Sequence, residues 1–319
     1  MSIQKGKEVV RIEAEAIQAL VDRIDDRFQK AVDIMLNCKG RIIITGMGKS
    51  GIIGRKIAAT LNSTGTSAIF LHPAEGVHGD LGVVLKDDVV ICISKSGNTE
   101  EILCLLPIFK RQGCAVITMT GNPDSTLGKQ SNVILDISVK EEACPYDLVP
   151  TSSSTAALVM GDALALALFQ ERGLSVEDYA MLHPAGDIGK RFFLRVDEIM
   201  RTKEDIAKVD TKTPITQTIL EISSKRLGAT CVMDKNNKLV GIITDGDLRR
   251  LMEKSHDIWN LKAEDIMCRY PKCIQSGVLA EEALRTMEEF SVNQLIVVDK
   301  KENPVGMVHI HDLLKAGLA

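Results

Sequence analysis

Strand and helix signals alternate along the first half of this 319-residue chain, and this alternation restricts its fold more than any other feature. Short apolar, partly β-branched segments predict strands at residues 41–45, 67–71, 88–93, 115–119 and 133–137. The order predicts an α/β fold, with a doubly wound, five-stranded parallel sheet and helices on both faces. Ligands of such sheets bind at the carboxyl ends of the strands, where the strand order reverses.

Helical patterns surround these strands. An apolar stripe predicts one helix over residues 7–36, and a long helix is expected to follow Thr151. The chain is 45% hydrophobic but only 3% aromatic, which indicates an aliphatic core.

After about residue 195 the chain contains an internal repeat. Val196–Met200 is echoed by Ala263–Met267, and Val240–Ile243 is echoed by Val305–Val308. Two copies of about sixty residues, each with a helix and then a strand pair, predict a tandem module that packs on itself. The expected domains are residues 1–192, 196–256 and 262–319. We expect the linker near residues 186–195.

The third predicted strand leads into a turn rich in hydroxyl groups. This turn contains Ser94, Ser96 and Thr99, and a helical pattern follows it. A helix N-terminus offers free backbone N–H groups and the positive end of its dipole, which suits a dianionic phosphate. One hydroxyl would be enough for an ordinary N-cap. Three within six residues favour phosphate binding.

A second polar turn, Gly46–Gly51, follows the first strand. It is not a Walker A loop, because the position that needs the first glycine is Ile43, inside the strand. It does match a dinucleotide fingerprint, but the second strand ends at His72 without the acidic residue that this site needs. The turn therefore predicts backbone amides, Lys49 and Ser50 near an anion. The alternative for Lys49 is an ordinary surface lysine.

Other polar clusters are also expected at the carboxyl edge of the sheet. The segment 72–80 holds two His, a Glu and an Asp; acid–base or hydroxyl-binding roles, simple packing and a metal remain open there. Glu141 and Glu142 are either solvated or placed to act as a base. Residues 151–155 open the long helix with an N-cap and further hydroxyls. His183 is either an exposed loop residue or a group that transfers protons near neutral pH.

Composition excludes several function classes. The formal net charge of −4 argues against nucleic acid as a partner. The polar N-terminus lacks the apolar stretch of a signal peptide. The longest apolar run, Ala156–Phe169, contains Asp162 and is expected to be too short to span a membrane. Eight cysteines without a Cys-x-x-Cys pair indicate reduced thiols. We expect a cytoplasmic protein.

Together these motifs resemble one family. GMGKSG, HPAEGVHGD, ISKSGNTEEI, KEEACPYDLVPTSSSTAALVMGDALA and LHPAGDIGK are similar to the sugar isomerase (SIS) domain of bacterial D-arabinose 5-phosphate isomerases, and the two repeats are similar to the CBS pair (an α+β module) of that family. The resemblance covers essentially the whole chain. It implies interconversion of D-ribulose 5-phosphate and D-arabinose 5-phosphate through a cis-enediol, which supplies Kdo for lipopolysaccharide or capsule. It implies no required cofactor, and a tetramer with shared active sites.

The resemblance also implies residue roles. The catalytic positions fall on Lys49, Glu101, Glu142 and His183. Substrate contacts of the family fall on Gly65, Thr66 and His78, and a position linked to inhibitory zinc falls on His72. With the hydroxyl groups above, the predicted substrate-binding set is Ser50, Gly65, Thr66, His78, Ser94, Ser96, Thr99, Ser152 and Ser153.

A mechanism follows from these roles as a hypothesis. Glu142 or Glu101 is the candidate base that moves a proton between C1 and C2. Lys49 would stabilise the enediolate oxygen. His183 would transfer the hydroxyl proton, and His183 or His78 would assist ring opening.

The repeats depart from the nucleotide-binding CBS pattern. The first repeat has its Gly-hydrophobic-hydrophobic-Thr-x-x-Asp ending with Thr244 and Asp247, whereas the second has His309 in place of the hydroxyl residue and keeps Asp312. One site for an adenosine nucleotide or CMP-Kdo is therefore predicted, and a purely structural module is the alternative. For the whole chain, the alternatives are an isomerase of hexose or heptose phosphates, a non-catalytic sugar-phosphate sensor, and a nucleotide sensor with a vestigial SIS half.

Overall fold

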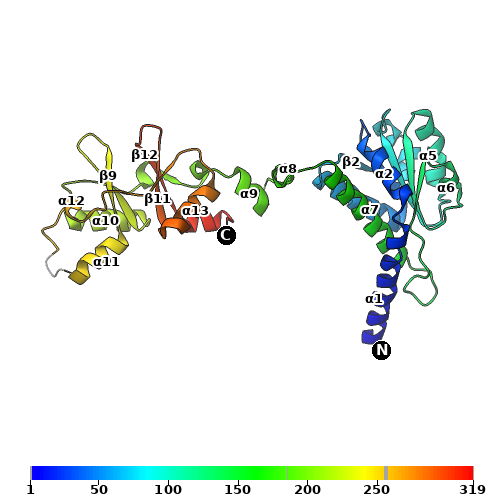
Figure 1. The fold of residues 1–319 in the computed structure, drawn as a ribbon, viewed down its shortest axis with the longest axis horizontal. Helices are drawn as coiled ribbons and strands as arrows, with labels where there is room; N and C mark the ends of the chain where they lie inside the picture. The colour runs from blue at the N-terminus through cyan, green and yellow to red at the C-terminus, as the bar shows by residue number, and fades with distance from the viewer. Residues whose placement is uncertain (1, 185, 255–257, 319) are drawn as a thin grey trace. The chain divides into compact units, whose positions relative to one another are not determined.

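The computed structural model describes residues 2–184, 186–254 and 258–318. The chain divides into two compact units, Met1–Leu182 and His183–Ala319 (Figure 1). Each unit has hydrophobic clusters of its own.

The first unit contains a five-stranded sheet. Its strands are β1 (Ile42–Gly46), β2 (Ala68–Leu71), β3 (Val89–Ser94), β4 (Ala115–Thr120) and β5 (Val133–Asp136). They lie in the order β2-β1-β3-β4-β5, and all neighbours pair in parallel. The predicted doubly wound parallel sheet is confirmed, and its strand order reverses between β1 and β3.

Helices cover both faces of this sheet (Figure 1). They are α1 (Ser2–Gln18), α2 (Asp26–Leu36), α3 (Gly48–Ser63), α4 (Pro73–Val77), α5 (Glu100–Arg111), α6 (Thr126–Gln130), α7 (Ser152–Glu171) and α8 (Val176–Met181), with 3₁₀ turns at Val21–Arg23 and Asp80–Val83. One face packs against α2, α3 and α7 around Met35, Ile57 and Leu164. The other face packs against α5 around Leu105 and Phe109. Burial on both faces explains why the strands read as continuous apolar runs.

The sequence predicts one helix over residues 7–36, and this prediction is wrong. The structure has a 3₁₀ turn at Val21–Arg23 between α1 and α2. Asp25 then starts a new helix, since its side chain accepts a hydrogen bond from the backbone N–H of Arg27 at 2.9 Å. An apolar stripe continues across this break, and so the pattern hides it.

Helix α7 has 20 residues and is long and apolar enough to cross a membrane by length and composition. The helix is longer than the apolar run Ala156–Phe169, and the expectation that this segment is too short to span a membrane is therefore wrong by length and composition. Half of the apolar stretch of this helix is buried inside the unit, where α7 packs against α1, α2 and α3. This packing is that of a core helix.

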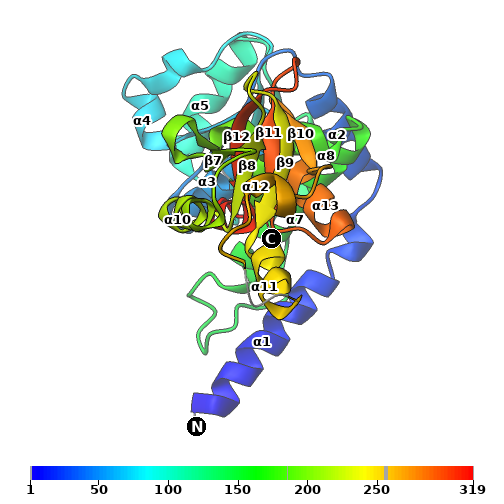
Figure 2. The same ribbon diagram turned by 90° about the vertical axis from the view of Figure 1, so that its left-hand side faces the viewer.

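The second unit is built from the two repeats. Its elements are α9 (Asp187–Phe193), a 3₁₀ turn (Val196–Glu198), β6 (Arg201–Thr202), a 3₁₀ turn (Lys203–Asp205), β7 (Lys208–Asp210), α10 (Ile215–Lys225), β8 (Ala229–Met233), β9 (Leu239–Thr244), α11 (Asp245–Lys254), α12 (Ala263–Ile266), β10 (Cys273–Gln275), α13 (Ala280–Phe290), β11 (Gln294–Val298), β12 (Pro304–His309) and α14 (Ile310–Lys315). Strands form the sheets β7-β8-β9 and β10-β11-β12-β6, and Figure 2 views this unit face on. Cys231 and Ile242 of the first repeat share a buried cluster with Ile296 and Met307 of the second. The repeats therefore pack on each other, as the sequence predicts.

The expected linker at residues 186–195 contains helix α9 instead. The ammonium group of Lys190 in this helix lies beside Gly317 near the end of the chain. Helix α9 belongs to the second unit, since the division between the two compact units falls between Leu182 and His183. The predicted domain bounds stay predictions.

Candidate active site

The point where the strand order reverses holds a cavity of about 410 Å³. Two turns meet there, one after β1 and one after β3. The cavity is lined by Met47, Ser50, Ile93, Ser94, Lys95, Ser96, Thr99, Gly121, Ile137, Val139 and Ser153. This is the place where parallel sheets of this strand order bind ligands.

The turn after β3 presents hydroxyl groups at the start of α5. The hydroxyls of Ser94 and Thr99 lie 2.7 Å apart, and the backbone N–H of Gly97 donates to Ser94 Oγ at 3.0 Å. Thr99 is the N-cap residue of α5, and within the described part of the chain its side chain makes no capping hydrogen bond. The first amides of this 12-residue helix are therefore not capped by a side chain. An anion bound here would accept hydrogen bonds from both the backbone amides and the hydroxyl groups.

The turn after β1 adds a second wall. Helix α3 starts at Gly48, and Lys49 and Ser50 lie in its first turn. Lys49 lines an adjoining cavity of about 190 Å³, to which Lys95 and Ser153 also contribute. Both cavities are bounded by Ser50 and Ser153, so the two turns and the start of α7 enclose one polar region.

Glu142 is buried beside this region and accepts hydrogen bonds on both oxygens. Lys95 Nζ donates to Oε1 at 2.7 Å, and the hydroxyl of Ser153 donates to the same oxygen. Oε2 accepts from the backbone N–H of Thr151 at 2.8 Å and of Ser153 at 3.1 Å. Burial alone would raise the pKa of Glu142, but these hydrogen bonds, chiefly from Lys95 and Ser153, lower it to about 2. Glu142 is therefore ionised near neutral pH, and its hydrogen bonds hold the carboxylate in position.

The hydroxyls at the start of α7 differ from the expected N-cap. The side chain of Thr151 makes no capping bond with the described residues of the helix. Instead it donates to Glu142 at 3.2 Å and accepts from the backbone N–H of Ala143 at 2.8 Å. Ser152 is buried, and its hydroxyl finds no hydrogen-bond partner among the described residues.

Several predicted residues come together around the cavities. Ser50, Ser94, Ser96, Thr99 and Ser153 line the larger one, and Lys49 lines the smaller one. Their roles stay predictions, but their placement at one edge of the sheet is what the order of strands and turns implies.

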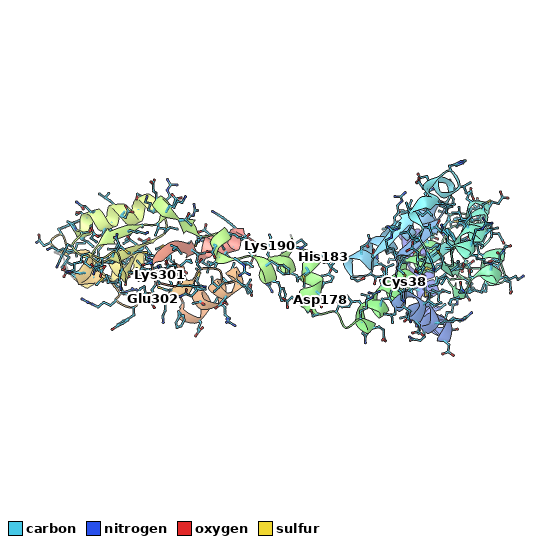
Figure 3. The ribbon with its side chains drawn as sticks, turned by 90° about the horizontal axis from the view of Figure 1, so that it is seen from above. Cys38, Asp178, His183, Lys190, Lys301 and Glu302 are labelled. Atoms are coloured by element: carbon cyan, nitrogen blue, oxygen red, sulfur yellow. The ribbon has the colours of Figure 1, made fainter. Side chains whose placement is uncertain are left out.

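Other predicted residues lie elsewhere. Gly65 and Thr66 precede β2 and so lie at the amino edge of the sheet, opposite the cavities. His78 follows the short helix after β2 and is exposed. Glu101 is the second residue of α5 and lines neither cavity. His183 belongs to the second unit, in the segment between α8 and α9 (Figure 3).

The predicted zinc contact at His72 gains no partners from the fold. Residue 72 follows β2, and its Nδ1 is buried without a hydrogen-bond partner in the described chain. No group of three or more His, Cys, Asp or Glu side chains suited to a metal occurs within residues 2–184, 186–254 and 258–318. The described residues of one chain therefore offer no such ligand group around His72, and the zinc contact stays a prediction.

The predicted nucleotide residues serve local structure in the second unit. The backbone N–H and hydroxyl of Thr244 donate to Asp247 at 2.9 and 2.7 Å, and Arg250 pairs with the other oxygen of Asp247 at 2.6 Å. Asp312 lies 3.4 Å from Arg201. A cavity of about 630 Å³ in this unit is lined by parts of β7 and α10 and by two hairpin turns, and none of the three predicted residues lines it.

Lys95 was not assigned a role by sequence reasoning. It lies between Ser94 and Ser96 in the hydroxyl-rich turn, and this position is the sequence feature that could have indicated a place in the site. Its partner Glu142 is 47 residues away along the chain, and therefore no local pattern shows their pairing.

Comparison with known proteins supports the family resemblance that the sequence motifs indicate. A SIS domain model matches residues 35–167, and a CBS domain model matches residues 196–254 and 263–319. Arabinose 5-phosphate isomerase KdsD of Pseudomonas aeruginosa is 47% identical over 316 residues, which cover 99% of this chain and 97% of that protein. KdsD of Escherichia coli K12 is 45% identical over 315 residues, with 99% and 96% covered.

Solved structures include one similar protein with a sugar phosphate. The structure of E. coli CFT073 c3406 in complex with arabinose 5-phosphate has a TM-score of 0.56 and 43% identity, and covers 57% of this chain and 97% of that one. The identity and the near-complete coverage of the curated relatives show that this chain belongs to the arabinose 5-phosphate isomerase (KdsD) family, with a SIS domain followed by a CBS pair.

Proposed function

We propose that this protein interconverts D-arabinose 5-phosphate and D-ribulose 5-phosphate and supplies Kdo biosynthesis. The observation that carries the proposal is the cavity of about 410 Å³ between the turns after β1 and β3, where three hydroxyls meet the start of α5. Relatives named arabinose 5-phosphate isomerase support it over the chain's length. In this assignment Ser94, Ser96 and Thr99 hold the phosphate.

The proposed reaction moves one proton between C1 and C2 through a cis-enediol. Lys49, at the smaller cavity, stabilises negative charge on the enediolate oxygen. A carboxylate with a pKa of about 2 is a weak base near neutral pH, which disfavours Glu142 for the proton transfer. Glu101 is then the carboxylate candidate, with His183 moving the hydroxyl proton. No cofactor takes part in this scheme.

We propose a homotetramer whose active sites are shared between subunits. Gly65 and Thr66 lie at the amino edge of the sheet, and so a single chain does not present them together with the phosphate turn. Apolar side chains on α1 and α7 are exposed, including Ile3, Val10 and Leu166. Light scattering tests this: a tetramer mass supports it, and a monomer with full activity contradicts it.

The compartment and the effector are proposed on similar grounds. We assign the protein to the cytoplasm, where soluble sugar-phosphate metabolism occurs, and a nucleotide or CMP-Kdo to the CBS pair. Calorimetry with AMP, ATP and CMP-Kdo tests the effector; no heat with any of them favours a structural module.

The activity test uses the purified full chain. D-arabinose 5-phosphate is supplied and formation of D-ribulose 5-phosphate is measured, with and without a chelator. Hexose and heptose phosphates are run beside it. Conversion of arabinose 5-phosphate alone is the expected result. Conversion of a hexose or heptose phosphate instead would assign another isomerase reaction, and no conversion by folded protein would favour a sensor.

A further inference from the structure

The charge of the larger cavity rests on one side chain. Among the described residues that line it, Lys95 is the only one with a charged side chain, and the others are apolar, glycine or hydroxyl residues. Lys49 lines the adjoining cavity but not this one. A dianionic phosphate at the start of α5 would therefore have Lys95 as its cation inside this cavity.

The backbone of Lys95 is held in place while its side chain stays accessible. Its carbonyl accepts a hydrogen bond from the backbone N–H of Gly121 at 3.0 Å, which ties the turn after β3 to the end of β4. The side chain is 48% exposed, and it lines both cavities. The ammonium group can therefore meet a ligand without any change in the fold.

Glu142 holds this ammonium group from the protein side. Its side chain is fully buried and lines neither cavity. Apart from Lys95, its hydrogen-bond donors are neutral groups of Thr151 and Ser153 at the start of α7. Glu142 is thus anchored at the start of α7, and it meets the cavities through Lys95 and Ser153, of which only Lys95 is charged.

We propose that Lys95 is the cation that binds the phosphate group of the substrate, and that Glu142 acts through it as a positioning residue. The proposal rests on the proposed function, because the ligand is the phosphate of that sugar phosphate. An ammonium group fixed by a buried carboxylate is oriented before the ligand arrives, which lowers the ordering cost of binding. It also separates the phosphate from the negative charge of Glu142.

The chain offers a matched control for this lysine. Lys56 on α3 pairs with Asp162 on α7 at 2.7 Å, and its side chain is 47% exposed. It therefore resembles Lys95 in exposure and in its carboxylate partner, but it lines none of the cavities described above. Lys56→Met shows what the loss of an exposed lysine and its ion pair does outside the cavities, with the difference that Asp162 is 37% exposed whereas Glu142 is fully buried.

The first experiment measures phosphate binding without turnover. Inorganic phosphate is titrated into the full chain and followed by phosphorus NMR, for the wild type and for Lys95→Met, Lys95→Arg and Lys56→Met. We expect Lys95→Met to raise the Kd for phosphate by about 10- to 100-fold, as for loss of a charged hydrogen bond. Lys95→Arg should keep most of the affinity and Lys56→Met all of it. An unchanged Kd in folded Lys95→Met, or no saturable binding to the wild type, would overturn the proposal.

The second experiment tests how Glu142 acts. In steady-state kinetics with D-arabinose 5-phosphate, Lys95→Met should raise KM more than it lowers kcat. Glu142→Gln should shift KM in the same direction, and adding it to Lys95→Met should cost little more. A fall in kcat by orders of magnitude when Glu142→Gln is added to Lys95→Met would show that Glu142 acts on the substrate directly and would overturn its positioning role.

The two experiments separate the possible failures. A wild type that binds phosphate but does not isomerise the sugar contradicts the proposed function, while the phosphate titration still decides the role of Lys95. A wild type that isomerises the sugar while Lys95→Met behaves like Lys56→Met contradicts only the role of Lys95.

Discussion

Gly97 lies in the hydroxyl-rich turn with a φ of 66°, and a β-carbon there would overlap with the side chain of Ser125. Gly113 has a φ of 80° but has open space around it, and therefore serves as a control. We expect Gly113→Ala to cost only the left-handed backbone energy, about 1–2 kcal/mol. Gly97→Ala should cost more and should raise KM by displacing the turn. Equal unfolding free energies and equal KM values for the two variants would show that the turn tolerates the overlap.

Glu142 makes the free energy of unfolding depend on pH in the acidic range. Its pKa falls from 4.5 to about 2 on folding, so the unfolded chain binds the proton more tightly. The carboxylate therefore stabilises the fold above pH 4.5, and this contribution is lost as the pH falls toward 2. Denaturant unfolding of the wild type and of Glu142→Gln measures it. The two stabilities should converge as the pH is lowered over this range; a constant difference would contradict the assigned pKa.

The sequence shows some site residues and hides others for physical reasons. Ser94, Ser96 and Thr99 are visible because strand, turn and helix start follow each other along the chain. The Lys95–Glu142 pair is not visible, since it forms across separate strand ends in space. Gly65 shows a third case: the family resemblance gives it a role, yet its position before β2 places it at the other edge of the sheet.

At the scale of elements, helix α11 explains the nucleotide motif without a ligand. Thr244 Oγ1 donates to the carboxylate of Asp247 at 2.7 Å and accepts from the backbone N–H of Asp247 at 3.2 Å. An N-cap residue provides a hydrogen-bond partner for a free backbone N–H of the first helical turn in this way. Thr244→Ala should destabilise the second unit by about 1 kcal/mol. Thermal unfolding without nucleotide measures this. Unchanged stability together with lost nucleotide binding would instead favour a ligand role.

Elements differ in how well local patterns predict them. The three central strands of the parallel sheet are almost fully buried and the edge strands β2 and β5 partly so, and the apolar segments predicted all five. The break between α1 and α2 and the helix at Asp187–Phe193 were not predicted. Both depend on a cap or on tertiary packing, which apolar periodicity does not record.

At the scale of the whole molecule, the separate cores predict separate unfolding. Leu61 is buried in the cluster between the sheet and α3, and Leu295 is buried in the cluster of the second repeat. Each Leu→Ala variant should lose about 2–5 kcal/mol in its own unit. Calorimetry should show two transitions, with Leu61→Ala lowering one and Leu295→Ala lowering the other. One transition shifted equally by both variants would show that the units unfold together.

The most direct test of the account compares two sugars that differ only in the phosphate. Purified protein is given D-arabinose 5-phosphate or D-arabinose, and formation of the ketose is followed in each case. The cavity at the start of α5 predicts conversion of the phosphorylated sugar and no measurable conversion of the free sugar. Equal conversion of both sugars, or of neither by the folded protein, would contradict the assignment of this edge of the sheet as a sugar-phosphate isomerase site.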